Sequence, residues 1–284
     1  MVWTFITAGV GSQDFEEAAD RLAQTIDSFQ LFDKIQVFKS SDVELYAPEI
    51  VSWYSKEELA GLKGYGWYIW KSRFAKVVVE DDFENSDGIM YLDAGCEAYL
   101  SVFSKKRLKK YMKIAERSGS CLFRIPTPER LYTKQLLLDR FSTVAKNLDE
   151  FQFQSGSWLF TGKVAKEFLK NWDEVVWEDK RFTDESISPS GEIEGFVCNR
   201  YDQAVFSMVA RSLSLSACGD VPPGDLSGFK PRARLFFYPF AWARNRQGVS
   251  LVSKRMKLIG EISLIPVVFR EKSIKILQSL LKVK

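Results

Sequence analysis

A short apolar run that ends in an acid most restricts what this chain can fold into. Residues Ile89 to Leu92 are apolar, and Asp93, Gly95 and Glu97 follow at once. Apolar runs of this length between turn residues are typical of buried strands. In open α/β sheets, ligands bind at the carboxyl ends of the strands, where Asp93 would lie. A carboxylate there can hold a divalent cation that binds a phosphate, or it can simply cap a helix or close a turn.

The first forty residues predict a strand, a loop, a helix and a second strand. The apolar segment 2–7 indicates the first strand, the spacing of apolar residues over 14–29 indicates the helix, and 35–38 indicates the second strand. This order is typical of doubly wound nucleotide-binding folds. Gly9 and Gly11 stand between the first strand and the helix, but the complete glycine-rich phosphate-binding patterns are absent. A plain glycine turn is the favoured interpretation of this loop.

The absence of histidine limits the chemistry available to the chain. All 284 residues contain none, while the hydrophobic content of 46% and the charged content of 27% are ordinary for a globular protein. Ser-His-Asp and Cys-His nucleophile systems are therefore excluded, as are histidine-ligated zinc and iron. Carboxylates, cations and oxygen-ligated magnesium or manganese remain, and this set suits phosphate-linked substrates. The net charge of +3 does not by itself argue for nucleic acid.

The cysteines and the apolar segments suggest a cytoplasmic protein. The four cysteines are widely scattered without a CxxC pair, which argues against a zinc or redox motif. No signal-peptide pattern is present at the start, and no run of eighteen or more apolar residues occurs. We expect residues 1–249 to form one α/β domain and residues 250–284 to form a basic tail.

An aromatic and basic segment at 64–73 is a candidate binding element for a ring joined to a phosphate. Two glycines and three closely spaced aromatic residues precede Lys71 and Arg73. Positive charge beside an aromatic wall suits a base or sugar ring joined to a diphosphate. Alternatively, Trp67 and Trp70 form the buried face of a helix that continues to residue 79.

Together, the segments 64–71 and 91–97 resemble bacterial capsule and O-antigen glycosyltransferases. These enzymes have the GT-A fold, a Rossmann-like α/β domain with a mixed central sheet flanked by helices. In that family a strand ends in an Asp-x-Asp motif that binds the ribose and a manganese or magnesium ion on the diphosphate. Here Asp93 matches the first acid and Gly95 stands at the third position. The resemblance implies either that Glu97 replaces the missing acid as a metal ligand or that fewer protein ligands hold the metal. The resemblance implies a nucleotide-sugar donor, most simply a UDP-sugar, with Thr7, Lys71, Arg73 and Asp93 among its contacts.

Two later segments complete the resemblance. Gln154, Ser155 and Gly156 look like the small-residue turn that precedes a strand beneath the donor sugar, although a plain β-turn explains them too. Asp202 and Gln203 look like the Asp-Gln pair beside the anomeric carbon, although an acid at a helix start is also favoured by the helix dipole. The resemblance implies that Asp202 and Gln203 are catalytic, with retention of configuration slightly preferred.

The remaining segments predict surface features. The pattern indicates a basic amphipathic helix at 105–117, a strand at 121–125 and helices at 133–148 and 163–172. A charged stretch at 173–194 predicts a flexible loop that orders over the donor, or a plain surface excursion. Arg244 and Arg246 could neutralise the leaving diphosphate or lie in a solvated loop.

The last 35 residues predict contact with a membrane surface. Residues 250–284 hold eight basic and two acidic residues, a net charge of +6, interleaved with apolar residues. Such a segment binds anionic membrane surfaces or packs as a terminal helix with an exposed basic face. We expect a glycosyltransferase acting on a glycan or lipid-linked glycan at the inner face of the membrane. The rivals are a non-catalytic nucleotide-sugar or glycan-binding protein and a nucleotidyltransferase, whose basic glycine-rich N-terminal loop the chain lacks.

Overall fold

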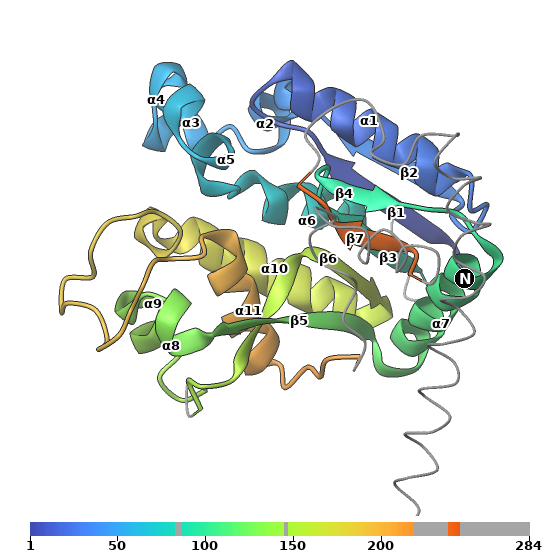
Figure 1. Ribbon diagram of the computed structural model, residues 1–284. Helices are drawn as coiled ribbons and strands as arrows, with labels where there is room; N and C mark the ends of the chain where they lie inside the picture. The colour runs from blue at the N-terminus through green and yellow to red at the C-terminus, as the bar shows by residue number, and fades with distance from the viewer. Residues whose placement is uncertain (83–86, 145–146, 219–237, 245–284) are drawn as a thin grey trace, which may run out of the picture.

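A mixed sheet forms the centre of the computed structural model, which describes residues 1–82, 87–144, 147–218 and 238–244 (Figure 1). Its five strands lie in the order β2-β1-β3-β6-β5. Strand β1 runs parallel to β2 and β3, whereas β6 runs antiparallel to β3 and to β5. The strands are β1 (Trp3–Ala8), β2 (Lys34–Phe38), β3 (Gly88–Leu92), β5 (Ser120–Pro128) and β6 (Phe151–Thr161). The predicted α/β class, a mixed central sheet flanked by helices, is confirmed.

Helices connect these strands, and a second small sheet lies near the end of β3. The long helices are α1 (Gln13–Asp27), α6 (Trp70–Asp82), α7 (Val102–Ser118), α10 (Gly162–Glu178) and α11 (Asp202–Ser212). The short ones are α2 (Ser40–Tyr46), α3 (Ile50–Trp53), α4 (Lys56–Gly61), α5 (Gly64–Trp67), α8 (Glu129–Tyr132), α9 (Gln135–Arg140) and the 3-10 turn η1 (Lys180–Phe182). The second sheet pairs β4 (Cys96–Ala98) with β7 (Phe240–Trp242) in antiparallel orientation.

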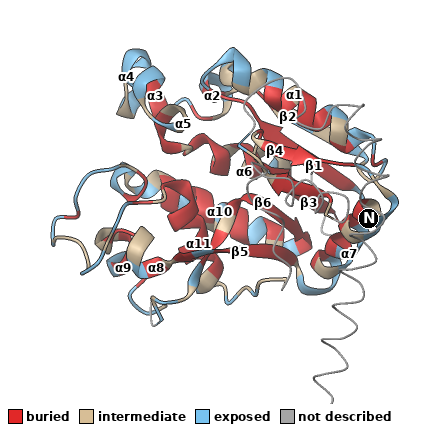
Figure 2. Cartoon of the chain, viewed as in Figure 1, coloured by how far each residue is buried: buried red, intermediate tan, exposed pale blue. Residues whose placement is uncertain are grey.

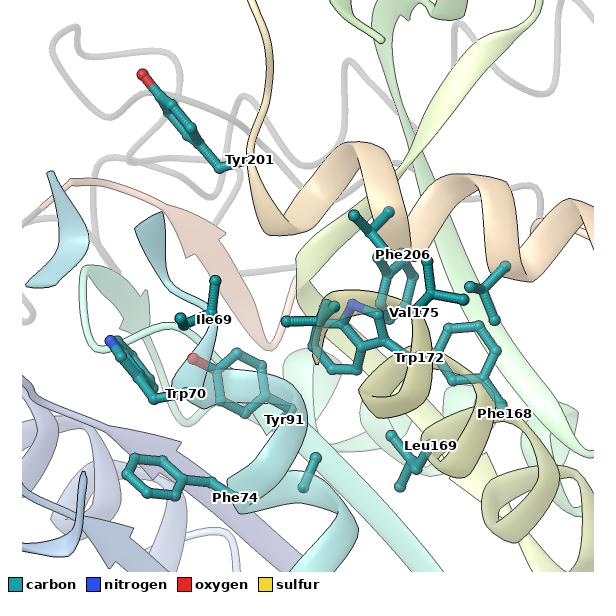
Figure 3. Packing of buried hydrophobic residues seen from close by; sticks show 14 of the residues in the cluster. Ile69, Trp70, Phe74, Tyr91, Phe168, Leu169, Trp172, Val175, Tyr201 and Phe206 are labelled. Atoms are coloured by element: carbon teal, nitrogen blue, oxygen red, sulfur yellow. The ribbon is translucent and has the colours of Figure 1, made fainter. Parts of the chain in front are cut away.

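Alternating side chains of β3 pack into two separate cores. Ile89 and Tyr91 join the core beneath α6, α10 and α11, while Met90 and Leu92 join the core beneath α1 and α7. Because successive strand residues point to opposite faces, an apolar run without alternation requires a sheet covered on both sides. The buried residues of the strands and the inner helix faces show both layers in Figure 2, and Figure 3 shows Tyr91 among Trp172, Phe206 and their neighbours in the first core.

Within the described residues, the predicted elements are confirmed except in three places. The helix expected at 133–148 is wrong, because among the described residues of this range only Gln135–Arg140 is helical, and Lys134 before it is extended. The turn expected at Ser155–Gly156 lies inside β6. The loop expected to begin at Asp173 begins six residues later, because α10 runs to Glu178 and buries Val175 and Val176.

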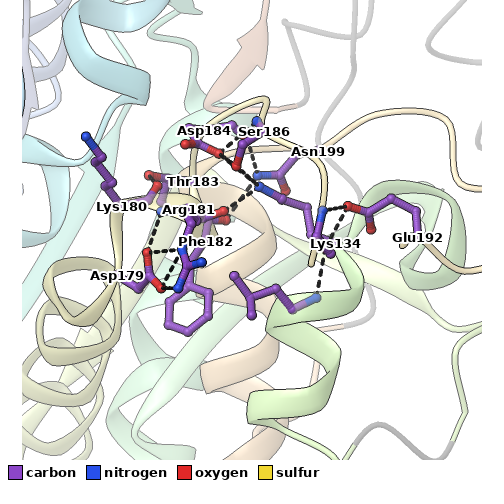
Figure 4. Close-up of polar contacts among 12 residues, drawn as sticks. Lys134, Asp179, Lys180, Arg181, Phe182, Thr183, Asp184, Ser186, Glu192 and Asn199 are labelled. Atoms are coloured by element: carbon purple, nitrogen blue, oxygen red, sulfur yellow. Dashed lines mark hydrogen bonds and ion pairs between the residues drawn. The ribbon is translucent and has the colours of Figure 1, made fainter. Parts of the chain in front are cut away.

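The segment after α10 is held by polar contacts. The buried Lys134 ammonium donates to the carbonyl of Arg181 at 2.6 Å and to Ser186 at 3.0 Å, and lies 2.9 Å from Asp184 (Figure 4). Glu192 accepts from the backbone N–H of Gln135 at 2.7 Å. This segment, predicted to be flexible, is therefore tied to the start of α9 at both of its ends.

Candidate active site

The side chain of Lys71 brings together two acids that lie more than a hundred residues apart in the sequence. Its ammonium lies 3.0 Å from Asp93 Oδ1 and 2.9 Å from Asp202 Oδ2. Lys71 is in the first turn of α6, Asp93 follows β3, and Asp202 begins α11. Lys71 is 3% exposed and Asp202 is buried, whereas the Asp93 side chain is 43% exposed. One carboxylate of this cluster, the Lys71 triad (Lys71, Asp93 and Asp202), is therefore accessible to a ligand.

Burial and charge set the protonation of the Lys71 triad. Burial alone would lower the pKa of Lys71, but the carboxylates of Asp202 and Asp93 outweigh it and raise the pKa. Burial raises the pKa of Asp202, and the ammonium of Lys71 opposes that shift. Burial also raises the pKa of Tyr91, whose hydroxyl donates to Asp93 Oδ1 at 2.8 Å. Lys71 is thus a fixed cation, and Tyr91 is a neutral donor that holds Asp93 in place.

Gly156 leaves room for Asp93. A Cβ at this position would lie 2.2 Å from Asp93 Oδ2 and 3.0 Å from Gln154 Nε2. The Asp93 N–H donates to the Gly156 carbonyl at 2.9 Å, which fixes the backbone after β3 against β6. Burial, the larger effect, raises the pKa of Asp202, and the Ser155 side chain lowers it. The segment 154–156 therefore lies at the Lys71 triad, which it reaches as part of a strand.

Gln203 lies beside Asp202 in the first turn of α11. It is largely buried, and its Nε2 donates to Gln152 Oε1 at 2.8 Å. Gln152 in turn donates to Thr133 Oγ1 at 3.0 Å and belongs to β6. An acid in the first turn of a helix is stabilised by the helix dipole. The helix dipole and the Lys71 ammonium both stabilise the Asp202 carboxylate. The helix-dipole explanation and the site interpretation are therefore compatible.

Tyr201 forms an aromatic and polar latch beside the triad. Its backbone has φ of 53° and ψ of −130°, and a positive φ is uncommon for an aromatic residue. Its ring stacks on Trp67 with the centroids 5.0 Å apart. Its hydroxyl accepts from Lys63 Nζ at 3.1 Å and donates to Glu185 Oε1 at 2.6 Å. We call Tyr201 with its partners Trp67, Lys63 and Glu185 the Tyr201 latch. It joins the segment before α5 to the segment before α11.

The segment Gly64–Tyr68 has an unusual backbone that explains its glycines. Tyr65, Trp67 and Tyr68 have φ of 52°, 62° and 64°. A Cβ on Gly64 would lie 2.4 Å from the Tyr68 ring, and one on Gly66 would lie 2.9 Å from Ile50. Trp67 and Trp70 are both buried, in keeping with the helix-face alternative, although they lie in separate helices. Lys71 comes directly after this constrained stretch, with its ammonium 5.2 Å from the centre of the Tyr68 ring.

A groove of about 610 Å³ lies at the carboxyl ends of β1 and β2. Strand β1 lies between β2 and β3, so this groove and Asp93 share one edge of the sheet. Ligands of open α/β sheets bind along this edge. The lining residues come from the loop after β1, from α1, from the start of α2 and from α5: Gly11, Ser12, Gln13, Glu16, Glu17, Asp20, Lys39, Ser40 and Tyr65.

Three predicted site residues have contacts away from the Lys71 triad. Glu97 is buried in an ion pair with Arg21, which also donates to the carbonyls of Ala94 and Cys96. Arg73 lies 3.1 Å from both Asp173 and Glu49. The fully buried Thr7 hydroxyl donates to the Leu92 carbonyl at 2.8 Å and so joins β1 to β3. The contacts of all three stabilise the fold around the site.

The late arginines and the tail fall largely outside the described residues. Arg244 follows β7, whose Ala241 pairs with Glu97 of β4, and has φ of 53°. Arg246 and the whole tail at 250–284, including the predicted domain boundary at 249, are outside the described residues. The helices in the described part of the chain include no candidate for a membrane span.

The expected divalent cation does not fit the residues at this position. Gly95 offers no side chain, Glu97 is paired with Arg21, and the Lys71 ammonium lies against Asp93. In the part of the chain that the structure describes, no three acidic or cysteine side chains are grouped closely enough to hold a metal. Asp93 and Glu97 therefore do not form the pair of metal ligands that the resemblance implied. A positive charge beside Asp93 is supplied by Lys71.

Sequence patterns missed the Tyr201 latch and the groove residues Lys39 and Ser40. Tyr201 could be suspected only because it precedes the Asp-Gln pair, while Lys39 and Ser40 directly follow a predicted strand. That position, at the carboxyl end of a parallel strand, is the signal that could have identified them.

No family model matches the chain, and no curated protein matches it. The solved structures similar to it include mouse xyloside xylosyltransferase 1 in its apo form, at 11% identity and a TM-score of 0.43, covering 88% of this chain and all of that one. The galactosyltransferase LgtC with donor and acceptor sugar analogues is similar at 9% identity and a TM-score of 0.46, covering 84% of this chain and 86% of that one. A glycosyltransferase involved in glycosylation of the major capsid of PBCV-1 has 11% identity and a TM-score of 0.46, covering 85% and 92%. Likeness of this degree carries no argument about activity, which must come from the site.

Proposed function

We propose that this chain is a glycosyltransferase that moves a sugar from a nucleotide-diphosphate sugar, most simply a UDP-sugar, to a hydroxyl of a glycan or lipid-linked glycan. The observation that carries the proposal is the Lys71 triad. Lys71, Asp93, Ser155, Gly156 and Asp202 come from four separate segments that resemble sugar transferases, and they meet at one edge of the sheet. Surface polysaccharide synthesis at the inner face of the membrane is the proposed setting.

The site residues divide into donor contacts and reaction contacts. The nucleotide would occupy the groove at the ends of β1 and β2, with the exposed Asp93 carboxylate accepting from ribose or sugar hydroxyls. Gly156 and Gln154 would lie beneath the sugar. Asp202 and Gln203 are the proposed catalytic residues, and because both are largely buried, the donor would have to displace their present contacts to reach them. We propose that the configuration is retained.

Charge on the departing diphosphate would be neutralised by protein cations. Arg244 and Arg246 are the proposed contacts, because guanidinium groups bind phosphate in bidentate fashion. Lys71 would act through Asp93, since its own ammonium is buried against the two acids. Preorganised charges of this kind stabilise leaving groups during transfer. Arg73 and Glu97 are not included in the proposed machinery.

The test is a thermal-shift panel of UDP-, GDP-, CMP- and dTDP-sugars, each with manganese and with EDTA. We expect one donor to raise the melting temperature, and the shift to persist in EDTA because the residues around Asp93 do not form a cation site. Loss of the shift in EDTA would contradict the metal-free site. No shift with any donor would contradict the transferase.

The second candidate is a non-catalytic nucleotide-sugar or glycan-binding protein on the same fold. Asp93 favours it in one respect, since this acid is already neutralised by Lys71 and Gly95 offers no second carboxylate. Hydrolysis of the stabilising donor in the absence of acceptor separates the two candidates. A binding protein gives a thermal shift without turnover, whereas a transferase releases sugar slowly, and the anomer first released reports the stereochemistry.

A further inference from the structure

The exposed face of α7 combines apolar and basic side chains in a single stripe. Val102, Lys106, Lys109 and Lys113 follow one another at intervals of four, three and four residues, which places them on one side of a helix. All four are exposed, and Val102 is 83% exposed. The opposite side, with Leu108, packs into the core. We call these four residues the α7 stripe.

We infer that the α7 stripe, together with the neighbouring Leu100, docks on an anionic lipid surface. Leu100 is also exposed, so two aliphatic side chains stand in water at one end of the stripe. No ion pair joins Lys106, Lys109 or Lys113 to another described residue. Lysines attract anionic headgroups, and aliphatic side chains enter the boundary between headgroups and acyl chains. A nucleic acid or a soluble polyanion would be matched by the lysines but not by Val102 and Leu100.

The first turn of α7 lies at the edge of the sheet that holds the Lys71 triad. Glu116, near the end of α7, accepts from Trp3 Nε1 at 3.4 Å, so the end of the helix lies beside the start of β1 (Figure 1). A 17-residue helix is about 25 Å long, so its first turn lies toward the carboxyl ends of the parallel strands. Asp93 follows the carboxyl end of β3. If the proposed function holds, a membrane bound by Val102 and Leu100 would bring a lipid-linked acceptor toward the site.

The experiment measures co-sedimentation of the full chain with vesicles of phosphatidylcholine, with and without phosphatidylglycerol. We expect binding only to the vesicles that contain phosphatidylglycerol, and weaker binding as salt is raised. Each lysine near an anionic surface changes the binding constant about fivefold. The variant K106Q/K109Q/K113Q should therefore bind on the order of a hundredfold more weakly. Val102→Ser should weaken binding by roughly tenfold, from the loss of apolar burial.

The matched control is K163Q/K166Q/K170Q on α10, which removes the same charge from exposed positions on another helix. It should bind vesicles like the unchanged chain. Equal losses in both triple variants, or no loss in the α7 variant, would overturn the inference and leave net charge or the tail as the cause. Binding to heparin without binding to vesicles would make α7 a polyanion site and would also overturn it. Donor thermal shifts, measured without vesicles, test the proposed function separately.

Discussion

Two buried lysines of this chain, Lys134 and Lys71, differ in whether their polar partners are exposed to solvent. The Lys134 ammonium is enclosed by the Arg181 carbonyl, Ser186 and Asp184, and this closed pocket ties a long segment to α9. The Lys71 ammonium lies between two carboxylates, one of which remains 43% exposed. The Lys134 ammonium makes its contacts with the protein groups around it. The Lys71 network, by contrast, leaves the Asp93 carboxylate held in place and exposed to solvent. A buried charge indicates a ligand site only when part of its network is open.

Lys71→Met should have the largest effect, because it leaves Asp202 buried without a cation. Loss of one partner of a buried ion pair costs about 3–5 kcal/mol in the free energy of unfolding. Urea unfolding measures this loss. In the double variant K71M/D202N most of the stability should return, because neither charge remains buried, while donor binding should not. Equal instability of the single and double variants would contradict the ion pair.

Lys134→Met should destabilise the chain by about 2–3 kcal/mol, since Asp184 keeps its contacts with Ser186 but loses the ammonium. Turnover, assayed well below the melting temperature, should remain within a few-fold of the unchanged chain. A loss of donor affinity as large as that in K71M would show that the closed pocket also serves the site, and would remove the distinction between the two lysines.

Gly156→Ala tests the open side of the Lys71 triad. The added methyl would lie 2.2 Å from Asp93 Oδ2, so Asp93 or the strand must move. Overpacking costs about 1–3 kcal/mol in stability, and we expect the donor-induced thermal shift to disappear. Gly61→Ala is the matched control, because nothing lies within 4 Å of a Cβ at that position. A normal donor shift in G156A would place the donor away from Asp93.

The smallest effect concerns alkaline pH. Because the pKa of Lys71 is raised in the folded chain, its stabilisation is complete below the pKa of an unfolded lysine, about 10.4, and is lost as pH rises toward the folded pKa. The free energy of unfolding should therefore fall above about pH 10, by at most about 1.4 kcal/mol per pH unit from this group. Urea unfolding at pH 9 and above should show a shallower fall in K71M/D202N.

The sequence predicted the strands and long helices because their apolar patterns are local. The run at 89–92 indicated a buried strand, and the structure explains it by two cores on opposite faces of β3. The helix at 133–148 failed because its pattern does not show that Lys134 binds residues fifty positions away. Ser155 and Gly156 looked like a turn because small residues favour turns, whereas here the small residues make room for Asp93.

The site could be predicted in part. Lys71, Asp93 and Asp202 were each predicted as site residues from separate motifs, and the structure brings their side chains together, although nothing in the sequence indicates that Lys71 lies between the two acids. Glu97 was expected beside Asp93. It lies four residues further along, beyond a turn, where it forms an ion pair with Arg21 of α1. Ion-pair partners of this kind are determined by tertiary packing, which cannot be predicted from the spacing of residues in the sequence.

The Tyr201 latch has a consequence for how force passes through the molecule. Its hydroxyl connects Lys63 with Glu185, and the next residue along the chain is Asp202. A displacement of either segment is therefore transmitted to the residue before α11 through the ring and hydroxyl of Tyr201. The segments that carry Lys63 and Glu185 are mechanically linked through Tyr201, so immobilising one restrains the other.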